Sequence, residues 1–212
     1  MVRRSIKMVI NYKNLLSESL LILNTTKTLK KITVTDLQKE SGISRQTFYN
    51  HFLDIDDLIQ YTYKKEIVVH WDPHDLDLDF YDHIIEDFSK TKKYHKFLKD
   101  AFDIHGQNNL LEYTINYCVQ FEQEWMQSFY GNETMPNSML NAVAFAAGGS
   151  MYMKIRWIMN GIDRPLLDVA QDVIDNENRC LTPLFFVNPD DSPFEKSAQK
   201  IRNERQKESI RD

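Results

Sequence analysis

Apolar residues recur at helical spacing along most of the chain. Between residues 5 and 25 one face collects Ile6, Val9, Ile10, Leu16, Leu20 and Leu23, while polar residues occupy another face. The same period predicts further helices at 34–41, 45–52, 55–69, 80–89, 92–103, 108–130, 138–160 and 165–176. Only 6 Gly and 6 Pro occur in 212 residues, too few for the many turns of an all-β fold. The pattern therefore predicts an all-α protein.

Capping signals divide residues 33–54 into short helices. Thr33 is placed to cap the helix that follows it, and Asp36 lies three residues later, where the acid of a capping box belongs. Gly42 suits the left-handed end of that helix, and Ser44 suits the cap of the next. Asp54 then begins a fourth helix. A helix, a tight turn and a second short helix form a helix-turn-helix, with apolar contacts expected among Leu37, Ile43 and Phe48.

Breaks in the pattern suggest three parts. Segment 70–79 is rich in acids and contains Pro73, so we expect it to link a head at residues 1–69 to a helical body at residues 70–177. From residue 178 onward the sequence contains three prolines and becomes mostly charged. We expect residues 178–212 to form a polar tail, either disordered or ending in a short exposed helix.

Composition narrows the setting of the protein. With 42% hydrophobic and 27% charged residues, the chain has the composition of a folded globular protein. Cys118 and Cys180 are too few for a disulfide framework, which favours a reducing cytoplasmic location. The basic N-terminus is not followed by a signal-peptide apolar core, and the most apolar stretch, at 142–153, is too short to span a membrane.

Charge is distributed unevenly between head and body. Residues 1–53 contain nine Lys or Arg against three acids, a net charge of +6, so the remaining residues carry −11 of the total of −5. A basic head on an acidic body suggests that the head meets a polyanion.

The second helix of the motif exposes residue types that read DNA. Arg pairs with guanine, Gln pairs with adenine, a Thr methyl meets the thymine methyl, and hydroxyls suit phosphates. Such residues cluster around the start and outer face of this helix: Ser44, Arg45, Gln46, Thr47, Tyr49 and Asn50. The alternative is an ordinary helical hairpin whose outer face is simply polar.

Residues 32–59 go further than a generic helix-turn-helix. They closely resemble the N-terminal domain of the tetracycline-repressor (TetR) family of transcriptional regulators in three segments: Ile32-Thr33-Val34-Thr35-Asp36-Leu37, Ser41-Gly42-Ile43-Ser44-Arg45-Gln46-Thr47-Phe48-Tyr49-Asn50-His51-Phe52 and Asp57-Leu58-Ile59. The resemblance implies that the second helix enters the major groove and that homodimers bind palindromic operators. It also implies DNA or phosphate contacts for Thr33, Ser44, Arg45, Gln46, Thr47, Tyr49 and His51, and packing roles for Phe48 and Phe52.

One position departs from the family pattern. Many members have Lys at the start of the fourth helix, where this chain has Asp54-Ile55-Asp56. Affinity is then expected to depend more on the N-terminal cations, which could reach a phosphate or the minor groove; the alternative is a solvated terminus. These cations are Arg3, Arg4 and Lys7.

The body is more loosely similar to a subgroup of that family. The stretches at 101–110 and 157–165 look like dihydroxyacetone-kinase regulators. The resemblance implies a ligand-binding domain whose last two helices form a four-helix dimer interface. Small residues at 142–150 allow close helix approach, so we expect an interface built from 138–176. Its expected residues are Ala144, Ala147, Gly148, Met151, Ile155 and Ile158; the alternatives are packing inside one subunit or room for a ligand.

Aromatic residues on the body helices suggest a pocket for an apolar or aromatic effector. The expected lining is Phe97, Phe102, Tyr113, Tyr117, Phe121, Trp125 and Tyr152, although any one of these residues also suits a core. His70, Asp72, His74 and Asp75 carry metal-type ligands, but Pro73 keeps the histidines off one helix face, so no metal site and no cofactor are predicted. Motifs of catalytic sites are not recognisable, and we do not expect an enzyme.

These features together predict a homodimeric, operator-binding regulator, most simply a repressor released by a small-molecule effector. The alternative interpretation is a helical protein–protein interaction module whose head has lost DNA binding. The acidic start of the fourth helix is the feature that supports this alternative.

Overall fold

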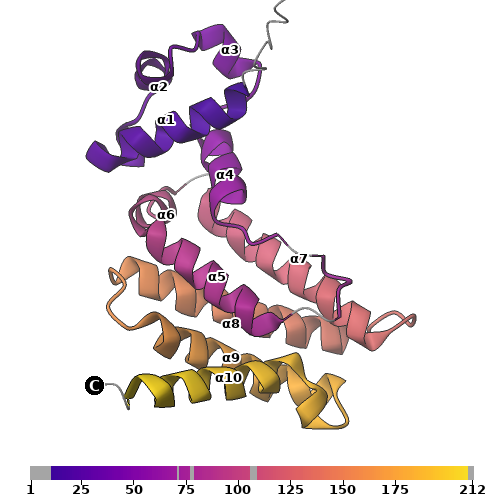
Figure 1. Ribbon diagram of the computed structural model, residues 1–212. Coiled ribbons are helices and arrows are strands. Elements are labelled where there is room, and N and C mark those ends of the chain that lie inside the picture. Colours follow the sequence, from indigo (N-terminus) through magenta and orange to yellow (C-terminus); the bar gives the residue numbers. More distant parts are fainter. Residues whose placement is uncertain (1–10, 71, 77–78, 106–108, 210–212) are drawn as a thin grey trace, which may run out of the picture.

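A computed structural model describes residues 11–70, 72–76, 79–105 and 109–209, and within these ranges every regular element is a helix (Figure 1). The all-α prediction is confirmed. The elements are α1 (Tyr12–Thr26), η1 (Leu29–Lys31), α2 (Val34–Ser41), α3 (Arg45–Tyr49), α4 (Ile55–Glu66), α5 (Phe80–Lys93), α6 (His95–Phe102), α7 (Leu110–Tyr130), α8 (Asn137–Met159), α9 (Leu166–Phe185), η2 (Pro189–Asp191) and α10 (Pro193–Ser209).

Local capping sets the boundaries of the head helices. The Thr33 hydroxyl accepts a hydrogen bond from the amide of Asp36, whose carboxylate accepts from the Thr33 amide, so the predicted capping box is present. Gly42 ends α2 in the left-handed conformation, with φ +71°. Ser44 caps α3 by accepting from the Thr47 amide at 3.0 Å. The first helix begins at Tyr12, and the part predicted before it lies outside the described residues.

The head packs around a small apolar core. Leu37, Ile43 and Phe48 are all buried, as expected for the residues that fix α2 against α3. They contact the apolar face of α1, where Leu16 and Leu20 are also fully buried. Figure 1 shows α1, α2 and α3 at one end of the molecule, with α4 leading from them into the body.

Head and body share one continuous core. The apolar cluster of the head includes Phe97 and Leu98 of α6, a helix of the body. Two polar contacts join the same parts: the Asn24 amide donates to the Asp100 carboxylate at 2.7 Å, and Lys30 pairs with Asp103 at 2.5 Å. The orientation of the head therefore depends on where α6 and α4 lie.

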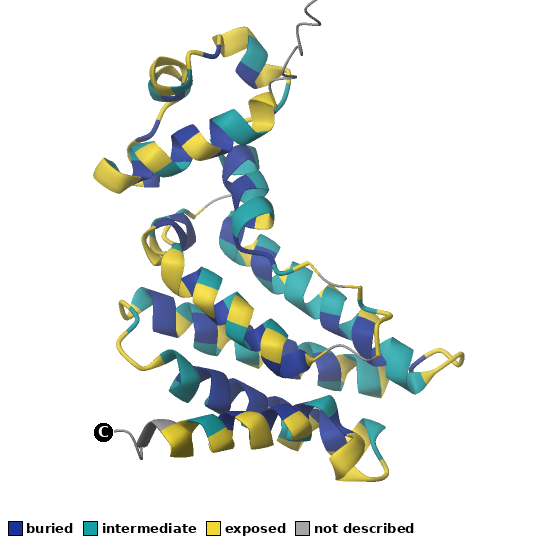
Figure 2. Cartoon of the chain, in the orientation of Figure 1, coloured by how far each residue is buried: buried dark blue, intermediate teal, exposed yellow. Residues whose placement is uncertain are grey.

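The body is built from α5 and α7–α10, packed in layers (Figure 1). Its core is a second apolar cluster, in which Phe88, Trp125, Ile174 and Phe194 are almost completely buried. Figure 2 shows buried residues along the helix surfaces that face one another in this layered part. Within the described ranges no helix carries an apolar stretch long enough to cross a bilayer.

The C-terminal segment differs from the polar tail expected from residue 178. Helix α9 continues to Phe185, and α10 packs against α9 and α5 with Phe194, Ala198 and Ile201 fully buried. Two of the three prolines begin new elements, because Pro189 opens η2 and Pro193 opens α10. The third, Pro183, lies inside α9. Charged residues surround these three apolar positions in the sequence. The segment was therefore predicted to be a polar tail, although one face of the helix is apolar.

Candidate functional site

The outer face of α3 is open to solvent. Arg45, Gln46, Tyr49 and Asn50 are exposed, and so is the cap residue Ser44. Thr47 is half-buried because its amide and hydroxyl both turn back to Ser44. All of the predicted base-reading residues except Thr47 are therefore exposed at or beside α3.

This surface is held from below by aromatic packing. Phe48 and Phe52 are only 1% and 3% exposed, and their rings lie 5.9 Å apart. The ring of Tyr49 meets Phe48 edge-on at 5.2 Å. Because Phe48 is the buried residue of this five-residue helix, its burial fixes which side of α3 faces outward.

Side-chain contacts also orient the exposed groups. The Arg45 guanidinium lies over the Tyr49 ring at 5.7 Å, a cation–π arrangement one helical turn apart. His51, half-buried, stacks on Tyr12 of α1 at 5.7 Å. Lys13 was not singled out from the sequence; it lies over the Phe52 and Tyr61 rings and adds an exposed cation beside α3.

Thr33 lies exposed at the start of α2 beside an ion pair. Lys27 and Asp36 are 2.6 Å apart, and the hydrogen bonds from Lys27 and then Thr33 hold the pKa of Asp36 well below its usual value. The Thr33 hydroxyl is already engaged with Asp36, at 2.7 Å. These contacts fix the N-terminal end of α2, so a phosphate that bound Thr33 would meet a side chain already held in place.

The acids at the start of α4 have a structural role. Asp54 accepts a hydrogen bond from the Asp57 amide at 2.8 Å, and the Asp57 carboxylate accepts from the Leu53 amide at 3.0 Å. Asp54 is thus the N-cap of α4, which explains an acid at this position. Arg3, Arg4 and Lys7 lie outside the described residues.

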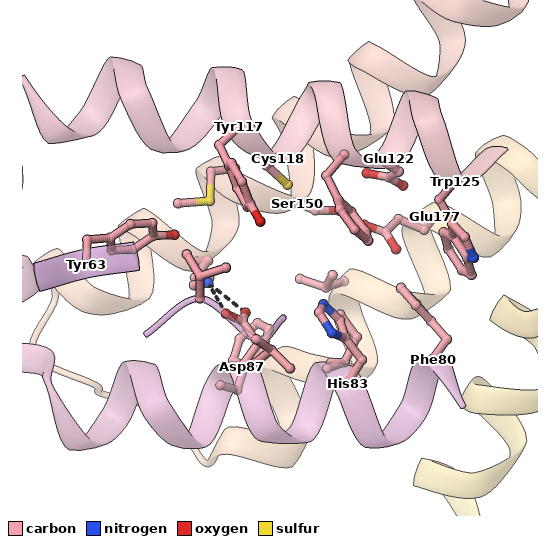
Figure 3. Close-up of a pocket in the computed structure, with 18 residues that line it drawn as sticks. Tyr63, Phe80, His83, Asp87, Tyr117, Cys118, Glu122, Trp125, Ser150 and Glu177 are labelled. Atoms are coloured by element: carbon pink, nitrogen blue, oxygen red, sulfur yellow. Dashed lines mark hydrogen bonds and ion pairs between the residues drawn. The ribbon is translucent and has the colours of Figure 1, made fainter. Parts of the chain in front are cut away.

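A cavity of about 110 Å³ lies in the body (Figure 3). Residues from α4, α5, α7, α8 and α9 surround it, together with the segment after α4. The lining residues are Tyr63, Val68, Val69, Phe80, His83, Ile84, Asp87, Phe88, Tyr117, Cys118, Phe121, Glu122, Trp125, Ser150, Met151, Lys154, Val173 and Glu177.

The aromatic residues predicted for a pocket divide into two groups. Tyr117, Phe121 and Trp125 line the cavity. The other four lie elsewhere: Phe97 and Phe102 are buried in the core shared with the head, Tyr113 stacks on Tyr117 outside the lining, and Tyr152 is 61% exposed. The period of a helix shows which residues share a face, but not which face meets a cavity.

Sequence reasoning did not find the polar groups of the cavity. Lys154 pairs with Asp87, its Nζ lying 2.6 and 2.8 Å from the two carboxylate oxygens, and the Lys154 side chain is only 9% exposed. Burial lowers the pKa of His83 to about 4, so this imidazole is neutral at pH 7.

Two glutamates occupy the same cavity. Glu122 and Glu177 are 6% and 4% exposed, and burial raises the pKa of both carboxyl groups, that of Glu177 to about 7. Repulsion from Glu177 adds to the increase at Glu122, while a hydrogen bond from Ser150 opposes the increase at Glu177. Figure 3 shows both side chains on the side of the cavity where Trp125 and Phe80 lie.

The face of α8 expected to form a dimer interface is partly internal. Ala147, Met151 and Ile158 are buried inside the chain, and Ala144, Gly148 and Ile155 are half-buried. The outward face instead contains Phe145, 78% exposed, with Gly149 and Tyr152. Each of the two faces of α8 therefore contains both small and large side chains, and packing against α7 and α9 determines which face turns inward.

The described residues of segment 70–79 are not among those that line the cavity. His74 forms a 3.1 Å hydrogen bond through Nδ1 with Ser128, and its amide donates to Asp72. In the ranges that the structure describes, no group of three His, Cys, Asp or Glu side chains is arranged to hold a metal ion.

The arrangement is that of an all-helical protein in which a helix-turn-helix head is joined to a helical body containing a cavity. A solved structure with a similar fold is the dihydroxyacetone kinase operon activator DhaS, with a TM-score of 0.55 and 13% identity over 79% of this chain and 95% of that chain. This likeness shows a shared fold. No protein-family model matches the chain, and no curated protein matches it in sequence.

Proposed function

We propose that this protein is a TetR-like transcriptional regulator that binds a palindromic operator as a homodimer. The observation that carries the proposal is the exposed face of α3, where Arg45, Gln46, Tyr49 and Asn50 stand on a buried Phe48. A rigid helix that presents Arg and Gln to solvent suits hydrogen bonding to base edges in the major groove. The fold shared with an operon activator supports the same function.

Helix α4 supplies a route from the cavity to the head. Leu58 is fully buried in the head core, and the Tyr61 hydroxyl donates to Asn14 of α1 at 2.7 Å. Tyr63, on the same helix, lines the cavity. An occupant that displaces Tyr63 therefore moves the helix on which the head is mounted.

Release of the operator then follows from a population shift. Two recognition helices must lie about 34 Å apart to enter successive major grooves. An effector that binds better to a form with another spacing shifts the protein away from DNA. We therefore propose a repressor that an effector in the cavity releases.

The dimer interface is proposed for the outward face of α8. Phe145 and Tyr152 flank Gly149 there, and Leu184 of the neighbouring α9 is also 48% exposed. A Cβ added to Gly148 or Gly149 would meet nothing within 4 Å, so packing inside the chain does not require either glycine. Each costs a helix about 1 kcal/mol relative to Ala. A second subunit lying close against this face accounts for that cost.

DNA binding is tested by retardation of the chain's own upstream DNA over a range of salt concentrations. We expect binding that weakens steeply with salt, because cations displaced from phosphates are released to solution. Arg45→Ala and Gln46→Ala should each cost about 1–3 kcal/mol and relax specificity at one position of each half-site. Arg205→Ala, on α10, is the matched control and should leave binding unchanged.

Two results would contradict the recognition surface. If Arg45→Ala retains both affinity and sequence preference, α3 does not read bases. If the wild-type protein retards no promoter-length duplex at low salt, the interaction-module interpretation is favoured instead.

The dimer is tested by the mass in solution at micromolar concentration. Gly149→Trp should give a folded monomer, because the side chain has room within one chain but obstructs a second. Affinity for the operator should fall although the head is untouched. Ile22→Trp, at an exposed position of α1, is the control and should remain dimeric. A monomeric wild-type protein, or a dimeric Gly149→Trp variant with normal DNA binding, excludes this interface.

A further inference from the structure

The cavity contains more acidic groups than cations to balance them. Asp87, Glu122 and Glu177 line it, together with one ammonium group, that of Lys154. Both oxygens of Asp87 already hold Lys154 at 2.6 and 2.8 Å. His83 has its pKa lowered to about 4 and carries no charge at pH 7. The two glutamates are therefore left without a cation from the residues that line the cavity.

Each glutamate also has an unused oxygen. Glu122 Oε1 and Glu177 Oε2 are buried and accept no hydrogen bond within the described part of the chain. The Ser150 hydroxyl supplies one hydrogen bond to Glu177. Buried polar atoms are almost always paired, so two unpaired carboxyl oxygens beside a cavity indicate a missing hydrogen-bond donor.

Aromatic rings lie beside these carboxyl groups. Phe80 and Trp125 stack with centroids 5.1 Å apart, and both line the cavity on the side of Glu122 and Glu177 (Figure 3). Aromatic faces attract cations and also bury apolar surface. The volume of about 110 Å³ is somewhat smaller than a cavity of about 150 Å³ that holds benzene. A ligand that fits without rearrangement has about five or six non-hydrogen atoms.

We propose that the cavity binds a small organic ammonium ion, with its N–H groups bonded to Glu122 and Glu177 and its apolar part against Phe80 and Trp125. A neutral molecule brings no positive charge to stabilise the ionised glutamates, and an anion would be repelled by an ionised carboxylate. Only the effector role of this ligand rests on the proposed function; its binding does not.

Binding also moves protons. Burial favours the protonated forms of both glutamates, and repulsion from Glu177 also favours the protonated form of Glu122. An ammonium ion favours the charged forms, so protons pass to the solvent as it enters. The other ionisable groups facing the site are Tyr63 from α4, His83 and Asp87 from α5, Tyr117 and Cys118 from α7, and Lys154 from α8.

The experiment is calorimetric titration of the full chain with four small probes of similar size. n-Butylamine, which is protonated at pH 7, should bind and should release protons, detected as a heat that depends on the ionisation enthalpy of the buffer. 1-Butanol, glycerol and butyrate provide neutral apolar, neutral polyol and anionic comparisons. Each should bind at least about tenfold more weakly, as expected when a charge-assisted hydrogen bond is lost.

Variants assign the binding to the glutamates. Glu122→Gln and Glu177→Gln should each weaken n-butylamine binding about tenfold or more and reduce the proton release. Glu112→Gln, at an exposed position of α7, is the matched control and should bind as wild type. Circular dichroism and melting temperature show that each variant is folded.

The outcomes separate this inference from the proposed function. Equal binding of 1-butanol or glycerol without proton release, tighter binding of butyrate, no binding of n-butylamine, or unchanged binding in both Gln variants would each overturn the ammonium site. DNA retardation without any ligand tests the regulator independently. Amine binding together with failure to bind DNA supports the site and contradicts the regulator.

Discussion

The head and the cavity treat polar groups in opposite ways. In the head, the acids near α2 and α4 are used in caps: Asp36 accepts from Thr33 and Lys27, and Asp54 accepts from the Asp57 amide. In the body, Glu122 and Glu177 are more deeply buried, yet each retains an unpaired oxygen. The acids of the head caps are thus paired within the chain, whereas each cavity glutamate has an oxygen without a partner among the described residues.

The two parts of the molecule therefore differ in how much stability their functional groups cost when no ligand is bound. Arg45 and Gln46 are exposed, so without DNA their polar groups form hydrogen bonds with water and cost the protein little stability. On binding, base edges replace this water. Buried carboxyl groups have no such alternative, and their burial costs free energy until a partner arrives. The two unpaired carboxyl oxygens beside the cavity therefore support the proposed ligand site more strongly than its aromatic residues do.

The largest expected effect is the loss of stability on replacing Phe48, the buried residue beneath the exposed face of α3. Phe48→Ala removes a ring that is 1% exposed between α2 and α3, so it should cost about 3–5 kcal/mol of stability. Urea unfolding measures the loss, and retardation should show that DNA binding is lost with it. Tyr49→Ala, at a 48% exposed neighbour, is the control and should change stability little. Comparable destabilisation by both variants would show that α3 is not anchored by Phe48.

Breaking the Lys154–Asp87 ion pair in the cavity should cost slightly less stability than Phe48→Ala. Lys154→Met leaves Asp87 without its cation in a partly buried site, which should cost about 3 kcal/mol. Lys90→Met breaks the more exposed Lys90–Glu86 pair on α5 and should cost less than about 0.5 kcal/mol. Chemical denaturation of both variants makes the comparison. Equal losses would mean that burial does not distinguish the two pairs.

Replacing Glu177 should increase the stability of the protein by an amount that depends on pH. The pKa of Glu177 rises from 4.5 to about 7, so the folded chain keeps a proton that the unfolded chain releases, and stability falls as pH rises from about 4.5 to 7. Glu177→Gln removes this loss and should stabilise the protein by about 1–3 kcal/mol at pH 8 but little at pH 4.5.

Melting temperatures of both proteins across this pH range provide the test. The difference between them is the informative quantity, because His83, with its pKa lowered to about 4, favours the folded state as pH rises from about 4 to 6.5 in both proteins. A difference that stays constant with pH would contradict an uncompensated carboxyl group at position 177.

The smallest effect concerns the acid that departs from the family pattern. Asp54→Asn keeps a good N-cap and removes a negative charge beside α3, so stability should change little while affinity for DNA rises a few-fold at low salt. Asp54→Ala should instead lose about 1 kcal/mol of stability with the cap. Affinity unchanged in Asp54→Asn would show that this carboxylate lies away from the DNA backbone.

Most of the head followed from its sequence because its signals are local. Thr33, Ser44, Asp54 and Gly42 mark helix ends through contacts within four residues, and all four ends appear where they were expected. Apolar spacing likewise identified Leu37, Ile43 and Phe48 as buried. Whether the exposed residues of α3 contact DNA remains a prediction.

The body depended on which helix surfaces meet. Periodicity predicted its helices, but it assigned Ala147, Met151 and Ile158 to an outer interface and treated residues beyond 178 as a tail. Packing against α7 and α9 turned that side of α8 inward. Phe194, Ala198 and Ile201 of α10 pack against α9 and α5 and are buried there.

The sequence by itself determined the helices, their caps and the basic, polar surface of the head, because these depend on neighbours along the chain. Only the tertiary structure decided the cavity. It brings together Asp87 of α5, Glu122 of α7, Lys154 of α8 and Glu177 of α9, and spacing along the chain does not show that these four helices meet there. Burial among distant helices, which changes the charge state of these groups, is a property of the packing and not of any local pattern.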